Sequence, residues 1–385
     1  MTPEMERPST RVVVYDDIEQ LPDNVRAFVS GSNPDALCLN GSWFELLIRF
    51  SPSEGYRPRI YVAMGSGDET VDCVLFAMST ARTRRPRKLL SLTNFYTMSY
   101  APLLRPDLVE PAEALDALAF HIASEEPNWD ILEFRSLVEE DRATAQLVRS
   151  FKRAGMFVDT YSQYENWFFP VQGVSAADYF ASRPSQVRNT IIRKLKKVRR
   201  DHNLDFHLYR STDDLSEGLI DYQTIYAGSW KLPEAHPEFI PQLIRRFADT
   251  NGLRLGVLRI DGEPAAAQIW LVTGRRATIY KLAYADKFAS LSAGSILTKM
   301  MFDWVLENDQ IAEIDYGIGS EPYKMAWMSA RRHIVALIGF NCRSGLGLLA
   351  AGRHLAGRLK RHILVNAGIG RSDPPAAAIG ASDVS

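Results

Sequence analysis

Apolar residues in the first half of the chain follow a strand period and then a helix period. Short apolar runs predict strands at 57–65 and 70–80, and a third strand at 89–100 follows a basic loop. The apolar spacing then changes to that of a helix over 111–129, and a short strand is predicted at 130–134. The first half therefore has the order of three strands, a helix and a strand.

The second half repeats this order, although its residues do not closely resemble those of the first half. Strands are predicted at 253–260, 265–273 and 277–285, a helix at 292–309, and a final strand at 312–317. An order of elements that occurs twice indicates two domains of one architecture.

A helix is also predicted at the start of each half, at 42–50 and at 184–201. The second of these helices carries one apolar stripe, formed by Val187, Ile191, Leu195 and Val198. Lysines and arginines cover the rest of it, and such a charged face is most often simply solvated. The alternative is an anion-binding surface in which Arg188 and Arg193 contact the substrate, because guanidinium groups suit phosphate oxygens.

The length of 385 residues exceeds that of a typical single domain. We predict a mixed α/β fold with an N-terminal domain at 11–165 and a C-terminal domain at 166–343. Residues 1–10 are polar and are expected to be flexible. A basic amphipathic helix is predicted at 344–370, and the small, Pro- and Ala-rich segment 371–385 is expected to be disordered.

Composition and charge narrow the class of protein. A hydrophobic share of 46% and a charged share of 24% are those of a soluble globular protein. The net charge of -1 provides no overall field for nucleic acid, which is not expected as a partner. The three cysteines lie far apart, the seven histidines lack metal-ligand spacing, and no apolar run is long enough to span a bilayer. We therefore expect a cytoplasmic protein with free thiols and no metal.

The order of helix, three-stranded meander, helix and strand resembles the GNAT acyltransferase fold, here twice in tandem. In the second half, the stretches "RNTIIRKLKK", "YKLAYADKFASLSAGSILTKMMFDW" and "IDYGIGSEPYKMAW" resemble the CelD/BcsL-type acetyltransferases. These are related to the Fem peptidoglycan aminoacyl-transferases and are often associated with exopolysaccharide synthesis. The resemblance implies acetyl-CoA, or another acyl-CoA, as the donor and an amino group as the acceptor.

The resemblance places the pyrophosphate of the donor at the start of the helix 292–309. The residues there are Ser292, Ala293, Gly294 and Ser295. A helix start offers unpaired backbone N–H groups, and small residues allow a phosphate to approach them. The alternative is an ordinary helix start that Ser292 or Ser295 caps.

Three residues near the last strand are predicted to carry the reaction: Asp315, Tyr323 and Lys324. Transfer from a thioester to an amine needs a proton acceptor, charge stabilisation for the oxyanion and a proton for the thiolate. The resemblance implies that Lys324 lies in the active cleft. The alternative for Asp315 is a cap or a buried partner for a basic side chain, and the alternative for Lys324 is a solvent-exposed lysine. Gly317 and Gly319 lie between these residues, and no helix is predicted after them.

Trp230, Tyr284 and Glu321 are candidates for contact with the acceptor. Indole faces commonly stack against sugar rings, so Trp230 is a possible wall of the acceptor pocket. Its alternative role is that of a core residue that closes the preceding helix. Glu321 is the second carboxylate near the end of the last strand.

In the predicted C-terminal helix, leucines alternate with arginines and lysines in the pattern of a basic amphipathic helix. It either packs on the core, lies on the anionic inner membrane or holds an anionic regulatory nucleotide.

The predicted function is N-acyl transfer from acyl-CoA to an amino sugar of an exopolysaccharide or cell-envelope glycan. One alternative is a Fem-like transferase that uses aminoacyl-tRNA on a peptidoglycan precursor. The other is a catalytically degenerate GNAT module with a regulatory role, because the helix start has only one glycine.

Overall fold

The computed structural model describes residues 10–31, 36–65, 70–81, 83–108 and 111–366. None of the helices in these ranges is long and apolar enough to cross a membrane.

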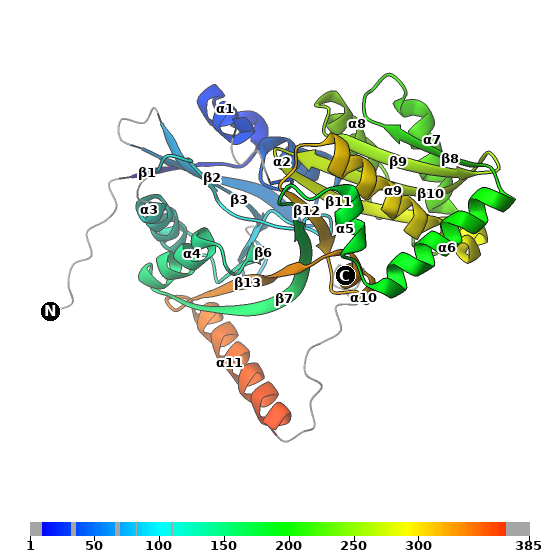
Figure 1. Ribbon diagram of the computed structural model, residues 1–385. Coiled ribbons are helices and arrows are strands. Elements are labelled where there is room, and N and C mark those ends of the chain that lie inside the picture. The colour runs from blue at the N-terminus through cyan, green and yellow to red at the C-terminus, as the bar shows by residue number, and fades with distance from the viewer. Residues whose placement is uncertain (1–9, 32–35, 66–69, 82, 109–110, 367–385) are drawn as a thin grey trace. The chain divides into compact units, whose positions relative to one another are not determined.

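The chain forms two compact units (Figure 1). Unit 1 comprises Met1–Asn33, Cys38–Glu165 and Arg332–Ser385, and unit 2 comprises Pro34–Leu37 and Asn166–Arg331.

Unit 1 contains a mixed sheet with the strand order β1-β2-β3-β4-β6-β13-β7, and β5 pairs with β3. Its strands are β1 (Arg11–Tyr15), β2 (Tyr56–Met64), β3 (Val71–Thr80), β4 (Lys88–Ser91), β5 (Leu103–Leu104), β6 (Ile131–Val138), the first part of β7 (Met156–Pro170) and most of β13 (Ala330–Asn341). Its helices are η1 (Ile18–Gln20), α1 (Asp23–Gly31), α2 (Gly41–Phe50), α3 (Pro111–Ser124), α4 (Arg142–Arg153) and α11 (Gly345–Asn366).

Unit 2 contains the strand order β7-β12-β11-β10-β9-β8. Besides the end of β7, its strands are β8 (Leu204–Tyr209), β9 (Leu253–Ile260), β10 (Glu263–Thr273), β11 (Arg276–Tyr284) and β12 (Glu313–Ile318). Its helices are α5 (Ala176–Ala181), α6 (Ser185–Asp201), α7 (Leu215–Ala227), α8 (Phe239–Asp249), η2 (Asp286–Leu291), α9 (Ala293–Asn308) and α10 (Pro322–Trp327). Helix α9 packs against β10, and α5 and α6 pack against α9.

The predicted repeat of elements is present in both units. In each unit an antiparallel meander is followed by a helix and by a strand parallel to the last meander strand. Leu90 on β4 faces Glu133 on β6, and Thr278 on β11 faces Asp315 on β12. A parallel neighbour requires a crossover connection, which α3 and α9 provide. Glu133 and Asp315 therefore hold equivalent positions in the two units.

Three expectations differ from the structure. The strand expected at 89–100 ends at Ser91, where the hydroxyls of Ser91 and Thr93 lie 2.9 Å apart and the chain turns. A short helix, α10, does follow Gly319, and it begins with a proline, which needs no helical N–H partner there. Residues after Arg331 lie in unit 1 rather than in the expected C-terminal domain, because β13 pairs with β6.

An aromatic cluster forms the core of unit 2 and holds α10 in place. The ring of Phe302 on α9 stacks on Tyr179 at 4.6 Å and on Trp327 at 5.3 Å, and it meets the ring of Trp270 edge-on at 5.0 Å. The hydroxyl of Tyr179 donates a 2.7 Å hydrogen bond to the carbonyl of Trp327. Such ring pairs stabilise beyond the area that they bury. The end of α10 is therefore tied directly to α5 and α9.

A buried ion pair connects the far end of α9 to the sheet. Arg254 on β9 contacts Asp309, the residue after α9, through Nε at 2.9 Å and Nη2 at 2.7 Å. The two side chains are only 4% and 9% exposed. Loss of one partner leaves an uncompensated buried charge, whereas replacement of both by apolar groups does not.

We expect Asp309→Ala to lower the free energy of unfolding by about 3–5 kcal/mol. The matched double variant Arg254→Met/Asp309→Leu should lose clearly less, because it leaves no buried charge. Urea unfolding followed by tryptophan fluorescence measures both. A double variant that is less stable than Asp309→Ala would contradict this account of the pair.

Candidate active site

Strand β12 leaves its regular pairing with β7 directly after Asp315. Asp315 faces Phe168, and the next pair is Ile318 with Asn166, so β12 has one extra residue in between. Gly317 lies in this segment at φ 71°, which glycine adopts without steric cost. The Asn166 amide donates hydrogen bonds to Asp315 Oδ1 at 2.6 Å and to the Gly317 carbonyl at 2.8 Å. Gly317 N also donates to Asp315 Oδ1 at 2.7 Å, so buried polar groups fix the bend.

Asp315 is therefore a buried acceptor inside the bend, with 8% of its surface exposed. Two amide groups, those of Asn166 and Gly317, donate hydrogen bonds to it. A catalytic role for Asp315 stays a prediction.

Lys324 lies on α10, and only 6% of its side chain is exposed. Its Nζ contacts the Ile318 carbonyl and lies 2.8 Å from the Glu321 carboxylate. The rings of Tyr316 and Tyr323 lie 5.9 Å and 6.0 Å from Nζ. A lysine is seldom buried unless it is paired. The alternative of a solvent-exposed lysine is therefore wrong.

Tyr323 and Glu321 are the accessible members of this group. Tyr323 is 46% exposed, and its ring meets the buried ring of Tyr316 edge-on at 5.6 Å. Partial burial and the Glu321 carboxylate raise the pKa of Tyr323 above its usual range. The Tyr323 hydroxyl therefore keeps its proton at neutral pH.

The start of α9 has no side-chain cap. Ser292 precedes the helix in the left-handed conformation, at φ 59° and ψ 38°, and its hydroxyl does not cap it. Ala293 is fully buried and Ser295 is exposed. A Cβ atom on Gly294 would lie only 3.0 Å from Cδ1 of Tyr284. The first-turn N–H groups thus have no capping side chain, and small residues surround them.

A chain of hydrogen bonds fixes the first turn of α9 to β10. The Trp270 indole donates to Gln268 Oε1 at 2.8 Å, and Gln268 Nε2 donates to Thr298 Oγ1 at 2.6 Å. The Thr298 hydroxyl donates to the Gly294 carbonyl at 2.9 Å. The helix start therefore has a defined position over the sheet.

Trp230 and Tyr284 form an aromatic surface next to this helix start. Their ring centroids lie 4.4 Å apart, and Tyr284 also borders Gly294. Trp230 is 52% exposed, so its alternative role as a core residue is wrong. The structure thus brings Trp230, Tyr284 and the predicted donor site together.

Lys231 is a residue that the sequence analysis did not single out. Its Nζ lies over the rings of Trp230 and Tyr226, at 5.8 Å and 6.0 Å. Burial, and then the positive charges of Lys281 and Lys324, lower the pKa of Lys231 to about 8. Lys231 thus lies against the aromatic surface, and the charges of Lys281 and Lys324 act on it. Its position directly after Trp230 was the only signal in the sequence.

Arg188 and Arg193 lie on α6. Within residues 166–331, all of which are described, neither of them contacts the residues of this group. Arg188 Nε donates to the Arg183 carbonyl at 3.0 Å, and Arg193 is exposed. Lys194, their neighbour, does approach the donor site, since its Nζ donates to the Ser290 carbonyl at 2.6 Å.

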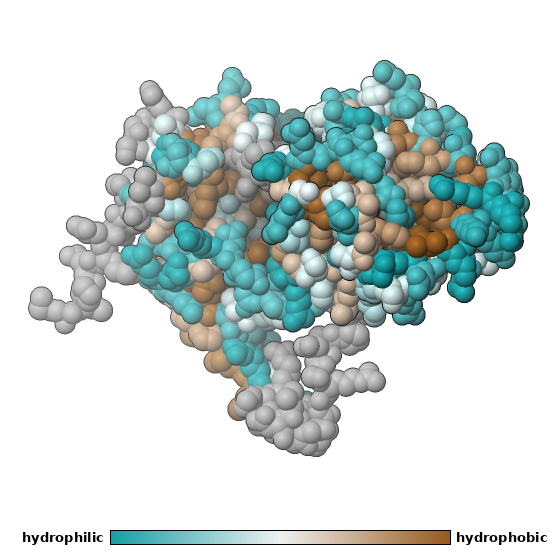
Figure 2. Space-filling model, viewed as in Figure 1, coloured by the Kyte–Doolittle hydropathy of each residue, from teal (hydrophilic) through white to brown (hydrophobic). Residues whose placement is uncertain are grey.

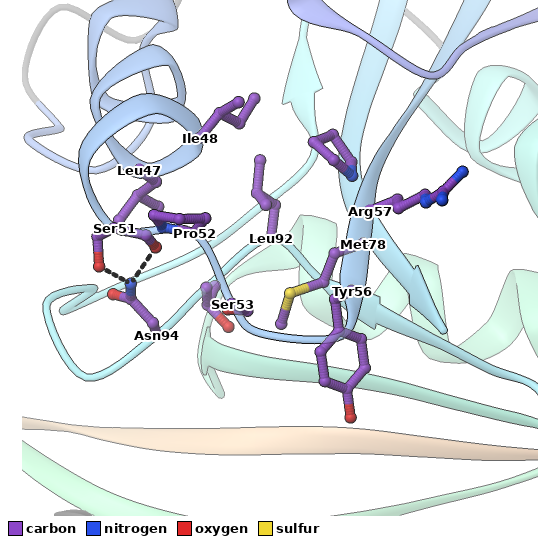
Figure 3. Close-up of a pocket in the computed structure, with 12 residues that line it drawn as sticks. Leu47, Ile48, Ser51, Pro52, Ser53, Tyr56, Arg57, Met78, Leu92 and Asn94 are labelled. Atoms are coloured by element: carbon purple, nitrogen blue, oxygen red, sulfur yellow. Dashed lines mark hydrogen bonds between the residues drawn. The ribbon is translucent and has the colours of Figure 1, made fainter. Parts of the chain in front are cut away.

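Unit 1 contains a small pocket of about 80 Å³ between the end of α2 and the start of β2 (Figure 3). Leu47, Tyr56 and Leu92 contribute to its largely apolar wall, and Arg57 is the one charged residue among those that line it. Figure 3 shows that Asn94 hydrogen-bonds the Ser51 hydroxyl, at 2.7 Å. The lysines and carboxylates described above, in contrast, belong to unit 2.

The described residues also contain one group of potential metal ligands, on unit 1. It consists of Glu139, Glu140 and His333. Both glutamates are exposed, and exposed acidic groups of this kind are common without an ion.

Residues 185–325 match the family model described as "Acetyltransferase (GNAT) domain". The match runs from the start of α6 into α10 and includes the aromatic surface, the start of α9 and Lys324. No curated protein gives a significant match to the chain.

Several solved structures share the fold. FemX has a TM-score of 0.56 and 11% identity, over 82% of this chain and 95% of that chain. L-PGS from Bacillus licheniformis has a TM-score of 0.51 and 14% identity, over 91% and 98% of the two chains. The C-terminal domain of a putative lysylphosphatidylglycerol synthetase from Agrobacterium fabrum has a TM-score of 0.50 and 13% identity, over 91% and 97%. The predicted tandem GNAT fold is confirmed, and residues 185–325 are similar to the GNAT acetyltransferase domain.

We expect Gly317→Ala to lower the free energy of unfolding by about 1–2 kcal/mol, because alanine is strained at positive φ. Gly357→Ala is the matched control, since Gly357 lies within α11 with open space around it. The control should be unchanged or gain up to about 1 kcal/mol. Thermal unfolding of both variants measures this, and a Gly317→Ala protein of wild-type stability would refute the constraint.

Proposed function

We propose that this protein moves an acetyl group, or another acyl group, from acyl-CoA to the amino group of an amino sugar. The family resemblance favours a glycan of an exopolysaccharide or of the cell envelope as the source of that sugar. The observation that carries the proposal is the uncapped start of α9, which lies beside an exposed indole and a buried lysine. The three features correspond to a phosphate site, an acceptor wall and a fixed positive charge.

The start of α9 suits the pyrophosphate of coenzyme A. Helix N–H groups and the positive end of the helix dipole favour an anion there. Ala293 and Gly294 are small, the ring of Tyr284 lies against Gly294, and Lys194 contacts the Ser290 carbonyl nearby. The pairing of β11 with β12 covers only Arg276–Thr278 with Glu313–Asp315, so the remainder of β11 is separated from β12. We place the acyl-bearing arm of the donor along that part of β11.

In the proposed reaction the acceptor nitrogen attacks the thioester carbon, and the carbonyl oxygen becomes negatively charged. Lys324 would stabilise this charge as a fixed cation, which is most effective in a site of low dielectric constant. The carbon–sulfur bond then breaks, and the amide forms. Glu321, of which 53% of the side chain is exposed, is the carboxylate that can take the amine proton.

Tyr323 would return a proton to the departing thiolate. The phenol is protonated at neutral pH, so its proton is available when the sulfur becomes negative. Asp315 would act as a positioning residue, since its hydrogen bonds to Asn166 and Gly317 set the course of the chain toward Lys324.

Lys324→Ala should lower kcat/KM by about 100-fold or more, the usual loss for one oxyanion-stabilising group. Release of coenzyme A thiol from acetyl-CoA, with a panel of amino sugars as acceptors, provides the assay. Lys299→Ala is the control, because Lys299 pairs with Asp303 on the same unit and is not in the proposed site.

The stability of Lys324→Ala should fall by only about 1 kcal/mol, the value of a typical lost hydrogen bond. A loss of stability that accounts for the whole loss of activity would return Lys324 to a structural role. No thiol release with any acceptor, and no binding of coenzyme A in calorimetry, would reject the proposed function. In that case binding of aminoacyl-tRNA would favour the Fem-like alternative, and absence of every ligand would favour the regulatory one.

We further propose that α11 places the protein on an anionic membrane surface. Figure 1 shows α11 leading away from β13, and Figure 2 shows hydrophobic residues along its outer side. Its leucines are 40–61% exposed: Leu346, Leu348, Leu349, Leu355 and Leu359. The opposite side is held by polar contacts, because His354 lies 2.7 Å from Asp159 and Arg358 also pairs with Asp159. The exposed Arg353 and Lys360 flank the leucines, as expected for a helix that lies on acidic lipids.

Leu355→Glu/Leu359→Glu should reduce binding to phosphatidylglycerol vesicles by about 100-fold, because each leucine loses roughly 1.5–3 kcal/mol of burial. Sedimentation with vesicles measures this. Ile220→Glu, at a single exposed apolar residue of α7, is the control and should bind like the wild type. Equal binding of all three proteins, or no binding by the wild type, would rule out this role of α11.

A further inference from the structure

Three lysines of unit 2 lie close enough to repel one another electrostatically, and none of them is fully exposed. Lys324 is 4% exposed, 21% of the Lys281 side chain is exposed, and Lys231 is half-buried. Lysine side chains are normally solvated, and burial of the ammonium group is costly without a counter-charge. The arrangement therefore needs an explanation.

Two carboxylates compensate two of these lysines. Glu234 pairs with Lys281 at 2.7 Å, and Glu321 pairs with Lys324 at 2.8 Å. Within residues 166–331, all of which are described, no carboxylate lies within ion-pair distance of Lys231. Three cations against two carboxylates leave one positive charge in excess, and that charge lies at Lys231.

The surroundings of Lys231 show the effect of this imbalance. Its ammonium group rests over the faces of Trp230 and Tyr226, which attract a cation only weakly. Burial and repulsion by Lys281 and Lys324 lower its pKa to about 8, and attraction by Glu234 and Glu321 does not offset this. An anion at this point would remove the repulsion and return the pKa of Lys231 toward its ordinary value.

The neighbouring surface indicates what carries the anion. Trp230 is 52% exposed and stands 4.4 Å from Tyr284, so a flat or ring-shaped body can lie on the indole while its charged group reaches Lys231.

We propose that Lys231 forms an anion subsite that takes a phosphate or carboxylate group of the acceptor. This inference rests on the proposed function, because the acceptor is the amine that this reaction acylates. It adds a substrate class to that function: the amino sugar is an anionic one.

Calorimetry with the full chain measures the binding of four probes. Inorganic phosphate, glucosamine 1-phosphate and muramic acid are anionic, and glucosamine has no anionic group. The anionic probes should bind at least about tenfold more tightly than glucosamine at neutral pH. Their affinity should fall above about pH 8, because an anion prefers protonated Lys231. In the falling range, binding should also take up a proton, which appears as a dependence of the heat on the buffer.

Two variants of Lys231 separate this subsite from any other anion site. Lys231→Met should lose the preference for anionic probes and the pH dependence. Lys231→Arg should keep the preference and lose the pH dependence, because arginine does not titrate in this range. Lys152→Met, at an exposed lysine of unit 1, should behave like the wild type in every measurement.

Anion binding that survives in Lys231→Met, or that shows no pH dependence in the wild type, would assign the anion to another site and overturn the proposal. Absence of any preference for anionic probes would overturn it too. The outcome is separable from that of the proposed function. Thiol release with neutral amino sugars alone would uphold the transferase and reject the subsite. Phosphate binding that depends on Lys231, without thiol release, would uphold the anion subsite and reject the proposed transferase function.

Discussion

The candidate site of unit 2 depends on one buried pair, Asn166 and Asp315. Parallel pairing with β11 brings β12 as far as Asp315, and from there the chain has to leave the sheet. A strand that departs exposes backbone polar groups, which are costly if they stay unpaired. The Asn166 amide and the Asp315 carboxylate satisfy those groups at Gly317. Because the departure is fixed, the short helix α10 and Lys324 that follow have a fixed place.

The second constraint on the site is electrostatic. Lys324 and Lys281 are each paired with a carboxylate, and Lys324 also lies near the rings of Tyr316 and Tyr323. Charges in such a medium act over longer distances than they do in solvent. The positive charges of Lys281 and Lys324 therefore act on Lys231 and contribute to its lowered pKa. Aromatic side chains and fixed cations thus determine together which ligands are stable in this region.

The fold could be predicted further than the site. Periods of apolar residues located the meander, helix and final strand of each unit, since these elements bury one continuous face. They did not reveal β7 or β13, whose partners lie far away in the sequence. Lys324 and Trp230 were found through the family resemblance. Lys231 was not, because its properties arise from Lys281 and Lys324, which are 50 and 93 positions away (281 − 231; 324 − 231). Periodicity describes burial but not the sum of charges at a point in space.

Helix α11 is held at its polar side and bare at its apolar side, the reverse of an ordinary surface helix. Its attachment relies on Asp159, whose pKa is lowered by His354 and Arg358, so the contact is present at neutral pH and is lost as that carboxylate protonates in acid. One acidic side chain therefore sets the direction in which a row of leucines points. Loss of that carboxylate would remove both polar contacts, with His354 and with Arg358, from the side of α11 opposite its exposed leucines.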